Sequence, residues 1–200
     1  MAFRRILKYP DNELRQRSIP VSEDDDVKDL VGDLFDTLNV SGGVGLSAPQ
    51  IGVHKRVIFV SCEQFTGEMI NPIIKETNGT SKLPEGCLSF PGVSEDIERS
   101  DDVVVEYKKL SGEKVTEKFT GFPAQIVQHE VDHLNGVLMI DSLSRLKRSK
   151  VLKRVQKVKK GVYDMLNNSL EKTPKRIKSE SHLSKKEVKK RKSRRKQNRR

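Results

Sequence analysis

Apolar residues recur at helical spacing between positions 25 and 38. They follow the i, i+3, i+4, i+7 rule, which predicts an amphipathic helix with one buried face. Ser22 or the acidic run Glu23–Asp26 suits the start of this helix, and Gly42-Gly43 suits its end. The apolar positions are Val27, Leu30, Val31, Leu34, Phe35 and Leu38.

Shorter apolar runs predict strands. Residues 57–60 are all apolar and predict a buried strand, and residues 69–74 predict another, which Asn71-Pro72 interrupts. Residues 103–107 and 114–119 flank a Ser-Gly pair, which is typical of a hairpin.

A second helix is expected to begin at Pro123 and to be capped by Gly136. It carries His129 and His133, which at positions i and i+4 lie on one face, so that both imidazoles can reach one metal ion. Glu130 lies beside them and can take a proton from an attacking water. The alternative is a surface helix on which the two histidines coincide by chance.

A catalytic metal site needs a third protein ligand. The candidates are Cys87, Cys62, His54, His182 and the carboxylates. Cys87 lies in a glycine-flanked turn, where the backbone can approach a ligand closely. Cys62 is expected to be an ordinary buried or edge thiol, His54 a solvated loop residue, and His182 part of the C-terminal tail.

Charge is distributed unevenly along the chain. Residues 1–140 contain 15 basic and 23 acidic side chains, which gives a net charge of −8. Residues 141–200 contain 24 basic and five acidic side chains, which gives a net charge of +19. Such a basic end favours a polyanion such as RNA as partner. No apolar run approaches the roughly 20 residues of a membrane helix, and no apolar signal region follows the first basic residues. We therefore expect no membrane insertion, a cytoplasmic location and reduced cysteines.

The basic end has two parts. Residues 145–166 keep a loose helical stripe of apolar positions among lysines and arginines, which predicts a basic amphipathic helix to about Asn167. After Pro174 the apolar content falls and basic residues dominate to Arg200, so that disorder is expected there.

Residues 42–52 contain four glycines in eleven positions, which is typical of a backbone that passes close to another group. This segment lacks the Gly-x-x-x-x-Gly-Lys-Ser/Thr pattern of a phosphate-binding loop. Together with the cysteine turn and the histidine helix, it resembles the motifs of one family, the peptide deformylases.

The family motifs are Gly-x-Gly-x-Ala-Ala-Pro-Gln, Glu-Gly-Cys-Leu-Ser and Gln-His-Glu-x-Asp-His-Leu. This chain has them, in the same order, as Gly43–Gln50, Glu85–Ser89 and Gln128–Leu134. The opening Ile6–Arg15 also resembles the family's usual start, so the likeness covers roughly residues 4–143. Ser47 departs from the pattern, because it replaces the usual first alanine, a small-for-small exchange expected to leave the loop intact.

The resemblance implies a metal held by Cys87, His129 and His133. The family commonly uses Fe²⁺, and Zn²⁺, Ni²⁺ and Co²⁺ are the alternatives; spacing alone would have favoured zinc. The implied reaction is hydrolysis of the N-formyl group from N-formylmethionyl nascent polypeptides, which releases formate. In that reaction Glu130 is the general base, and the Gln50 side-chain amide and the Leu88 backbone N–H stabilise the oxyanion.

The resemblance also implies that the Gly43-Val44-Gly45 backbone pairs with the extended peptide like an added strand. We choose Val44 and Ile126 for the apolar pocket of the methionine side chain. Glu85 is interpreted either as a carboxylate that orients a ligand or as an exposed turn residue. Arg99, beside Asp101 and Asp102, is interpreted as part of a surface ion pair rather than as a substrate contact.

Two further polar residues have simple interpretations. Gln128 is expected to hydrogen-bond within its own helix, and Asp132 to be a solvated acidic position.

These observations predict an α+β fold, with antiparallel sheets packed around a central metal-binding helix and followed by a basic helix and tail. The predicted divisions are a catalytic domain at residues 1–143, the basic helix at 144–167 and the tail at 168–200. We expect a monomer.

Two other functions fit parts of the sequence. A metallopeptidase could use the His-Glu-x-x-His geometry on a peptide bond. Cys87 argues against this alternative, because zincin peptidases generally take a histidine or a carboxylate as the third ligand. An RNA- or ribosome-binding protein would use the basic end. We combine this second idea with deformylation, since nascent chains emerge at an RNA-rich surface to which residues 145–200 could dock.

Overall fold

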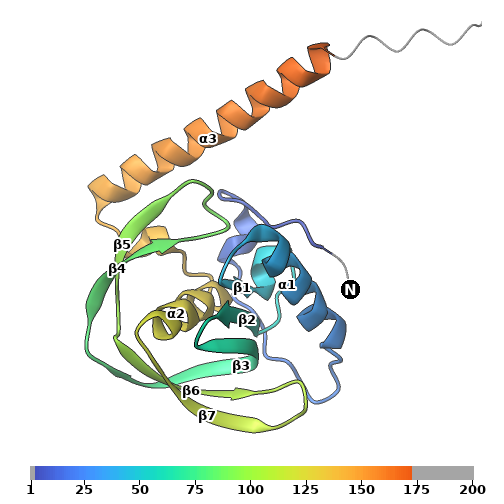
Figure 1. Cartoon of the computed structure of the whole chain (residues 1–200), viewed down its shortest axis with the longest axis vertical. Helices are drawn as coiled ribbons and strands as arrows, with labels where there is room; N and C mark the ends of the chain where they lie inside the picture. The colour runs from blue at the N-terminus through green and yellow to red at the C-terminus, as the bar shows by residue number, and fades with distance from the viewer. Residues whose placement is uncertain (1–2, 173–200) are drawn as a thin grey trace, which may run out of the picture. The chain divides into compact units, whose positions relative to one another are not determined.

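The computed structural model describes residues 3–172, with side chains up to Val158, and it combines helices with antiparallel strands (Figure 1). The strands are β1 (Gly45–Ser47), β2 (Val57–Cys62), β3 (Phe65–Asn78), β4 (Ser81–Gly86), β5 (Ser94–Arg99), β6 (Asp102–Lys108) and β7 (Lys114–Thr120). The α-helices are α1 (Lys28–Ser41), α2 (Phe122–Leu134) and α3 (Arg145–Lys172), and the 3₁₀-helices are η1 (Asn12–Arg15), η2 (Ala48–Ile51) and η3 (Met139–Ser142).

The strands form two antiparallel sheets, which confirms the predicted α+β class. One sheet has five strands in the order β1-β2-β3-β6-β7, and the other consists of β4 and β5 alone. Strands β6 and β7 form the predicted hairpin. The strand β1 is an edge of the larger sheet, with β2 as its neighbour.

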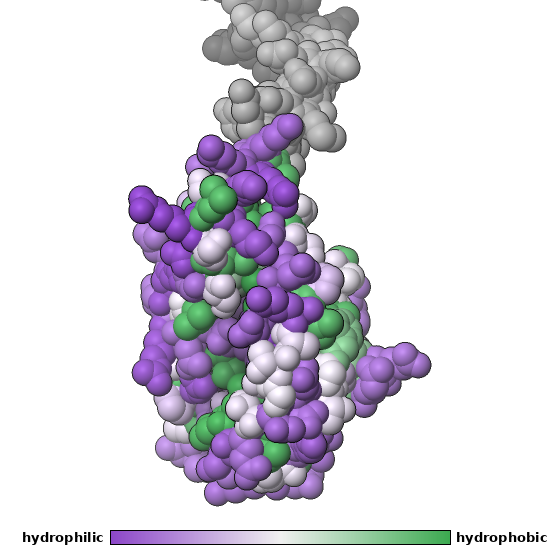
Figure 2. All heavy atoms as spheres, turned by 90° about the vertical axis from the view of Figure 1, so that its left-hand side faces the viewer, coloured by the Kyte–Doolittle hydropathy of each residue, from purple (hydrophilic) through white to green (hydrophobic). Residues whose placement is uncertain are grey.

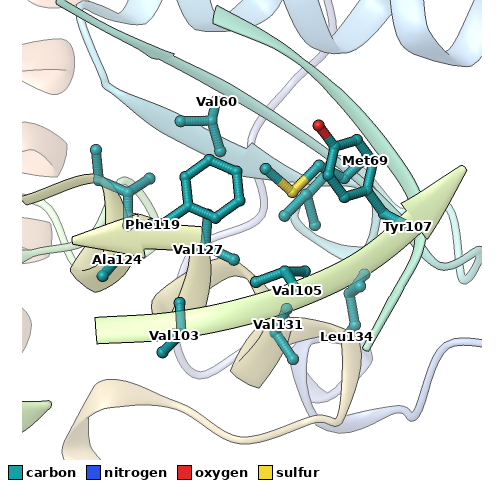
Figure 3. Packing of buried hydrophobic residues seen from close by; sticks show 12 residues of the cluster. Val60, Met69, Val103, Val105, Tyr107, Phe119, Ala124, Val127, Val131 and Leu134 are labelled. Atoms are coloured by element: carbon teal, nitrogen blue, oxygen red, sulfur yellow. The ribbon is translucent and has the colours of Figure 1, made fainter. Parts of the chain in front are cut away.

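Helix α2 packs against one face of the five-stranded sheet (Figure 3). In strand β2, Ile58 and Val60 point to this helix, whereas Val57 and Phe59 belong to the cluster with α1. A strand covered on both faces needs apolar side chains at every position, which explains why residues 57–60 do not alternate with polar ones.

Strand β3 is longer than predicted, and it continues through Asn71-Pro72, which was expected to interrupt it. The register with β6 shifts between Ile70 and Ile73, and Asn71 adopts a positive φ of 53°. Its side-chain amide bonds to both the N–H and the C=O of Val21, each at 2.8 Å. A bulge therefore accommodates the proline without breaking the strand.

The helix ends are close to those expected. Helix α1 starts at Lys28, later than predicted, because Ser22 donates to Asp25 in a separate turn and the N-cap Val27 offers no side-chain bond. Gly42, with φ of 67°, ends this helix as predicted. Gly136, with φ of 71°, lies just beyond the end of α2.

The basic helix α3 begins at Arg145 and extends past the predicted Asn167. Val151 and Val155 are 0% and 2% exposed, and they pack into a cluster that also contains Phe90, Val93 and Ile97. The start of α3 is thus part of the hydrophobic core, and the compact unit formed by the chain's contacts extends to Gly161. The division of the chain into domains stays a prediction.

Hydrophilic side chains dominate the face of the molecule shown in Figure 2, and hydrophobic ones are scattered among them. Within residues 3–172, no helix is both long enough and apolar enough to cross a membrane. The expected tail beyond Pro174 lies outside the described residues.

The burial of Val151 and Val155 generates a stability prediction. Replacing either with alanine removes buried methyl groups and leaves a cavity, so the free energy of unfolding should fall by about 2 kcal/mol in urea titrations. Leu146→Ala, on the same helix but 69% exposed, is the control and should change it by less than about 0.5 kcal/mol. Equal effects of the buried and exposed substitutions would show that α3 does not pack on the core.

Candidate metal centre

Three predicted ligands come together at one point. Cys87 follows strand β4, and His129 and His133 lie one turn apart on α2. Their ligand atoms lie within 4.8 Å of one another, and the Cys87 Sγ is 3.2 Å from the His133 Nε2. A thiolate and two imidazoles suit Zn²⁺, Fe²⁺ and related divalent ions.

The two imidazoles are oriented for this role. His129 directs its Nδ1 to Glu85 Oε1 at 2.6 Å, which leaves its Nε2 for a metal. His133 is buried, and its Nδ1 has no hydrogen-bond partner among the described residues. Burial and the neighbouring His129 hold the pKa of His133 well below its ordinary value, so this ring is neutral, as a metal ligand must be.

His129 has the opposite tendency. Burial alone would lower its pKa, but the electrostatic attraction of Cys87 and the hydrogen bonds to Cys87 and Glu85 raise it well above the ordinary value. The site therefore attracts positive charge, and a cation can replace the proton on this ring. This charge demand is a further sign that the donor set fits a divalent metal.

Glu85 and Arg99 form a buried ion pair behind His129. The guanidinium binds the carboxylate through Nε and Nη2, both at 2.9 Å, and reaches Asp132 through Nη1 at 2.6 Å. Although burial raises the pKa of Glu85, its bonds to His129 and Arg99 lower the pKa to about 2. The expectation of a surface ion pair for Arg99 is wrong in its location, because the Arg99 side chain is 9% exposed and pairs with Glu85 and Asp132. Asp132 is therefore paired rather than merely solvated.

The remaining candidate ligands lie elsewhere. Cys62, at the end of β2, packs beside the cluster that joins α2 to the sheet, as expected of a structural thiol. His54 lies near Glu13, with its Nε2 at 3.7 Å from that carboxylate. His182 is outside the described residues. Gln128 bonds to the Ala124 carbonyl in its own helix, as expected, and also to the backbone of Ser100.

Glu130 is buried beside the three ligands, and its Oε2 has no hydrogen-bond partner in the described part of the chain. Burial raises its pKa to about 7, against the charge of His129, which lowers it. A carboxyl group with a pKa near neutrality can both accept and return a proton. The absence of a side chain at Gly45 leaves room for it, because a Cβ there would lie 2.5 Å from the Glu130 Oε1.

Gln50 points its amide nitrogen at the cysteine turn. Its Nε2 lies 3.6 Å from the Cys87 Sγ and donates to the Ser89 Oγ at 3.2 Å. Its Oε1 accepts from both the N–H and the hydroxyl of Ser47, each at 2.9 Å. The loop of Gln50 and the turn of Cys87 are thus in direct contact.

The N-terminal segment connects the same two loops. The Leu7 N–H donates to the Gln50 carbonyl at 2.8 Å, and the Tyr9 N–H to the Ser89 carbonyl at 3.0 Å. Between them, the Lys8 ammonium donates to the Leu88 carbonyl at 2.6 Å. We had not predicted a site role for Lys8, and its only signal was its place within the opening motif.

A cavity of about 680 Å³ opens at the centre. Its walls include Cys87, His129, Glu130, Gln50 and Leu88, and also the four residues predicted to bind substrate, which are Gly43, Val44, Gly45 and Ile126. The structure thus brings a potential metal site, a buried carboxyl group and a peptide-sized cavity together. This arrangement is typical of metal-dependent hydrolases.

Comparison with known proteins identifies the family. Residues 3–149 match the family model of polypeptide deformylase. The peptide deformylase of Maricaulis maris is 42% identical over 167 residues, which cover 80% of this chain and 96% of that protein. A crystal structure of a peptide deformylase from Legionella pneumophila is 37% identical with a TM-score of 0.76, covering 80% of this chain and 96% of that one. The crystal structure of the peptide deformylase of Ehrlichia chaffeensis in complex with actinonin has a TM-score of 0.75 at 36% identity. The match covers 78% of this chain and 98% of that one.

The chain therefore belongs to the peptide deformylase family. Enzymes of this family are metal-dependent hydrolases that remove the N-formyl group from nascent peptides. The family and the α+β fold expected from the sequence are both confirmed.

The buried ion pair generates a second prediction. Arg99→Met leaves the Glu85 carboxylate buried without its guanidinium, which should lower the free energy of unfolding by about 3 kcal/mol in urea titrations. Arg99→Lys should recover only part of this, because an ammonium group cannot form the two-pronged bond. Lys82→Met is the control, since Lys82 and Glu98 form an exposed ion pair that should contribute little to the free energy of unfolding. Equal stabilities of the Arg99→Met and Lys82→Met variants would contradict the prediction.

Proposed function

We propose that Cys87, His129 and His133 hold one divalent metal ion and that this centre removes the formyl group from N-formylmethionyl peptides. The converging donor atoms carry this proposal. We propose Fe²⁺ as the metal by family resemblance, with Zn²⁺, Ni²⁺ and Co²⁺ as alternatives, since such a donor set accepts several ions. Metal analysis of protein purified anaerobically identifies the ion.

A cation in this site makes water a stronger acid and polarises the formyl carbonyl group. In the proposed reaction Glu130 accepts the proton of the attacking water and passes it to the departing amine, which releases formate and a free N-terminal methionine. Its buried, unpaired Oε2 and its pKa near 7 support this role. The Gln50 amide and the Leu88 N–H would donate to the oxyanion, because both residues line the cavity beside Cys87.

The substrate would bind along strand β1. This strand is an edge of the sheet, so the Gly43-Val44-Gly45 backbone can pair with an extended peptide as one further strand. Val44 and Ile126 both line the cavity and offer apolar surface to the methionine side chain. The close contact of Gly45 with Glu130 would place the formyl end of that peptide beside the proposed base.

The central experiment measures formate release from a short formyl-methionyl peptide, with the unformylated peptide as control. A deformylase releases formate and leaves every peptide bond intact. Cleavage of internal peptide bonds would instead favour the metallopeptidase alternative.

A third prediction concerns Glu130. Glu130→Gln keeps the shape of the side chain but cannot accept a proton, so kcat for formate release should fall by at least about 100-fold. The bound metal should remain, because its three ligands are intact, and plasma emission analysis of the variant checks this. Glu130→Ala should likewise lose activity while it keeps metal. Activity within a few-fold of the unaltered enzyme would overturn the proposed role.

We further propose that the basic C-terminal region docks the enzyme on the ribosome, in the cytoplasm, and that the enzyme works as a monomer. Formylated nascent chains emerge at a surface rich in RNA phosphates, and α3 exposes Lys147, Lys150, Lys153 and Lys157. The tail, outside the described residues, adds further positive charge.

A fourth prediction tests this docking. Deleting residues 168–200 should weaken ribosome association in sedimentation assays and flatten its dependence on salt, since fewer phosphate contacts remain. The turnover of a short formyl peptide should stay within about twofold of that of the full-length enzyme, because the deleted part lies outside the compact unit that forms the site. Unchanged ribosome binding would contradict the proposal.

A further inference from the structure

Ser47 is fully buried between strand β1 and the short helix η2. It begins the sequence Ser47-Ala48-Pro49-Gln50, which has the Ser-x-x-Gln spacing of a capping box. As in that motif, the Gln50 side chain reaches back to the Ser47 N–H. The Ser47 hydroxyl donates to the same Gln50 Oε1.

The backbone bond determines which way the Gln50 amide faces, and the hydroxyl adds a second bond to that orientation. An amide carries an oxygen acceptor on one side and two N–H donors on the other. Because the Ser47 N–H can only donate and lies 2.9 Å from the amide oxygen, that oxygen must face Ser47 and the nitrogen must face the cysteine turn. With the amide in this orientation, the Ser47 hydroxyl donates to the same oxygen, also at 2.9 Å. The reversed amide would set its N–H₂ group against the Ser47 N–H and its carbonyl oxygen against Cys87.

The hydroxyl contributes more than the backbone bond alone. The hydroxyl donates to the second lone pair of the buried Gln50 Oε1, a lone pair that would otherwise have no donor. It also restricts rotation of the amide about the end of the side chain.

We propose that Ser47 is a positioning residue that holds the Gln50 amide with its N–H₂ group directed into the cavity. The proposal rests on the role of Gln50 in the proposed function. At this position the family pattern usually has alanine, so the second bond to Gln50 is a feature of this chain rather than of the motif it resembles.

The test is Ser47→Ala in the metal-loaded enzyme. Loss of one oriented hydrogen bond should lower kcat about five-fold, while KM and metal content stay within about twofold. In zinc-loaded protein labelled with ¹⁵N, the order parameter of the Gln50 side-chain N–H₂ group should fall. That measurement reports orientation without depending on turnover.

Two comparisons separate positioning from general structure. Ser18→Ala removes another buried serine hydroxyl, one without a hydrogen-bond partner among the described residues, and should leave kcat unchanged. In a Gln50→Ala background, Ser47→Ala should add less than about twofold, because residues that act through one another are not additive.

Three results would overturn the inference: an unchanged kcat in Ser47→Ala, an equal loss in Ser18→Ala, or a full additional loss in the Gln50→Ala background. Failure of the proposed function looks different, since the unaltered enzyme itself would then release no formate from the formyl peptide.

Discussion

The site depends on the burial of α2. Nearly every side chain of this helix is inside the protein, including His129, Glu130 and His133, and a buried polar group is costly unless it has a partner. For His129 that partner is Glu85, whose charge is in turn balanced by Arg99. Glu85 and Arg99 come from β4 and β5, so this chain of bonds fastens the small sheet to the helix. Cys87 follows β4 directly, and the same bonds therefore determine where its thiol meets the two imidazoles.

A second constraint is the distance between β1 and α2. Gly45 lies so close to α2 that a Cβ would contact both Ile126 and Glu130, at 2.7 and 2.5 Å. The absence of that atom lets an edge strand run directly beside a buried carboxyl group. Backbone N–H and C=O groups that can pair with a peptide are thereby placed next to a group that can move a proton. The glycine serves the geometry of the cavity rather than a turn, since Gly45 has no positive φ.

Much of this architecture could be predicted from local patterns. Periodicity identified α1, the Ser-Gly pair between two apolar runs identified the β6–β7 hairpin, and Pro123 and Gly136 marked the ends of α2. The buried partners of Arg99 could not be predicted, since they belong to other elements, and an arginine beside two aspartates is typical of a surface ion pair. Asn71-Pro72 was expected to interrupt β3, whereas the register shift against β6 shows a bulge, which the bonds between Asn71 and Val21 hold in place. The burial of Val151 and Val155 was equally hidden within a strongly basic stretch.

The N-terminal segment explains how two loops distant in sequence keep one geometry. Gln50 and Leu88, the proposed oxyanion donors, belong to separate motifs, and their relative position depends on whatever joins them. The Leu7 and Tyr9 N–H groups donate to the Gln50 and Ser89 carbonyls, respectively. The Tyr9 ring also stacks on the Phe90 ring, with 5.0 Å between the ring centroids. Hydrogen bonds between backbone groups can form with almost any side chain at these positions, whereas the bond from Lys8 to the Leu88 carbonyl requires a long cationic side chain. The opening motif is therefore a structural part of the site, although none of its residues is a proposed ligand, base or oxyanion donor.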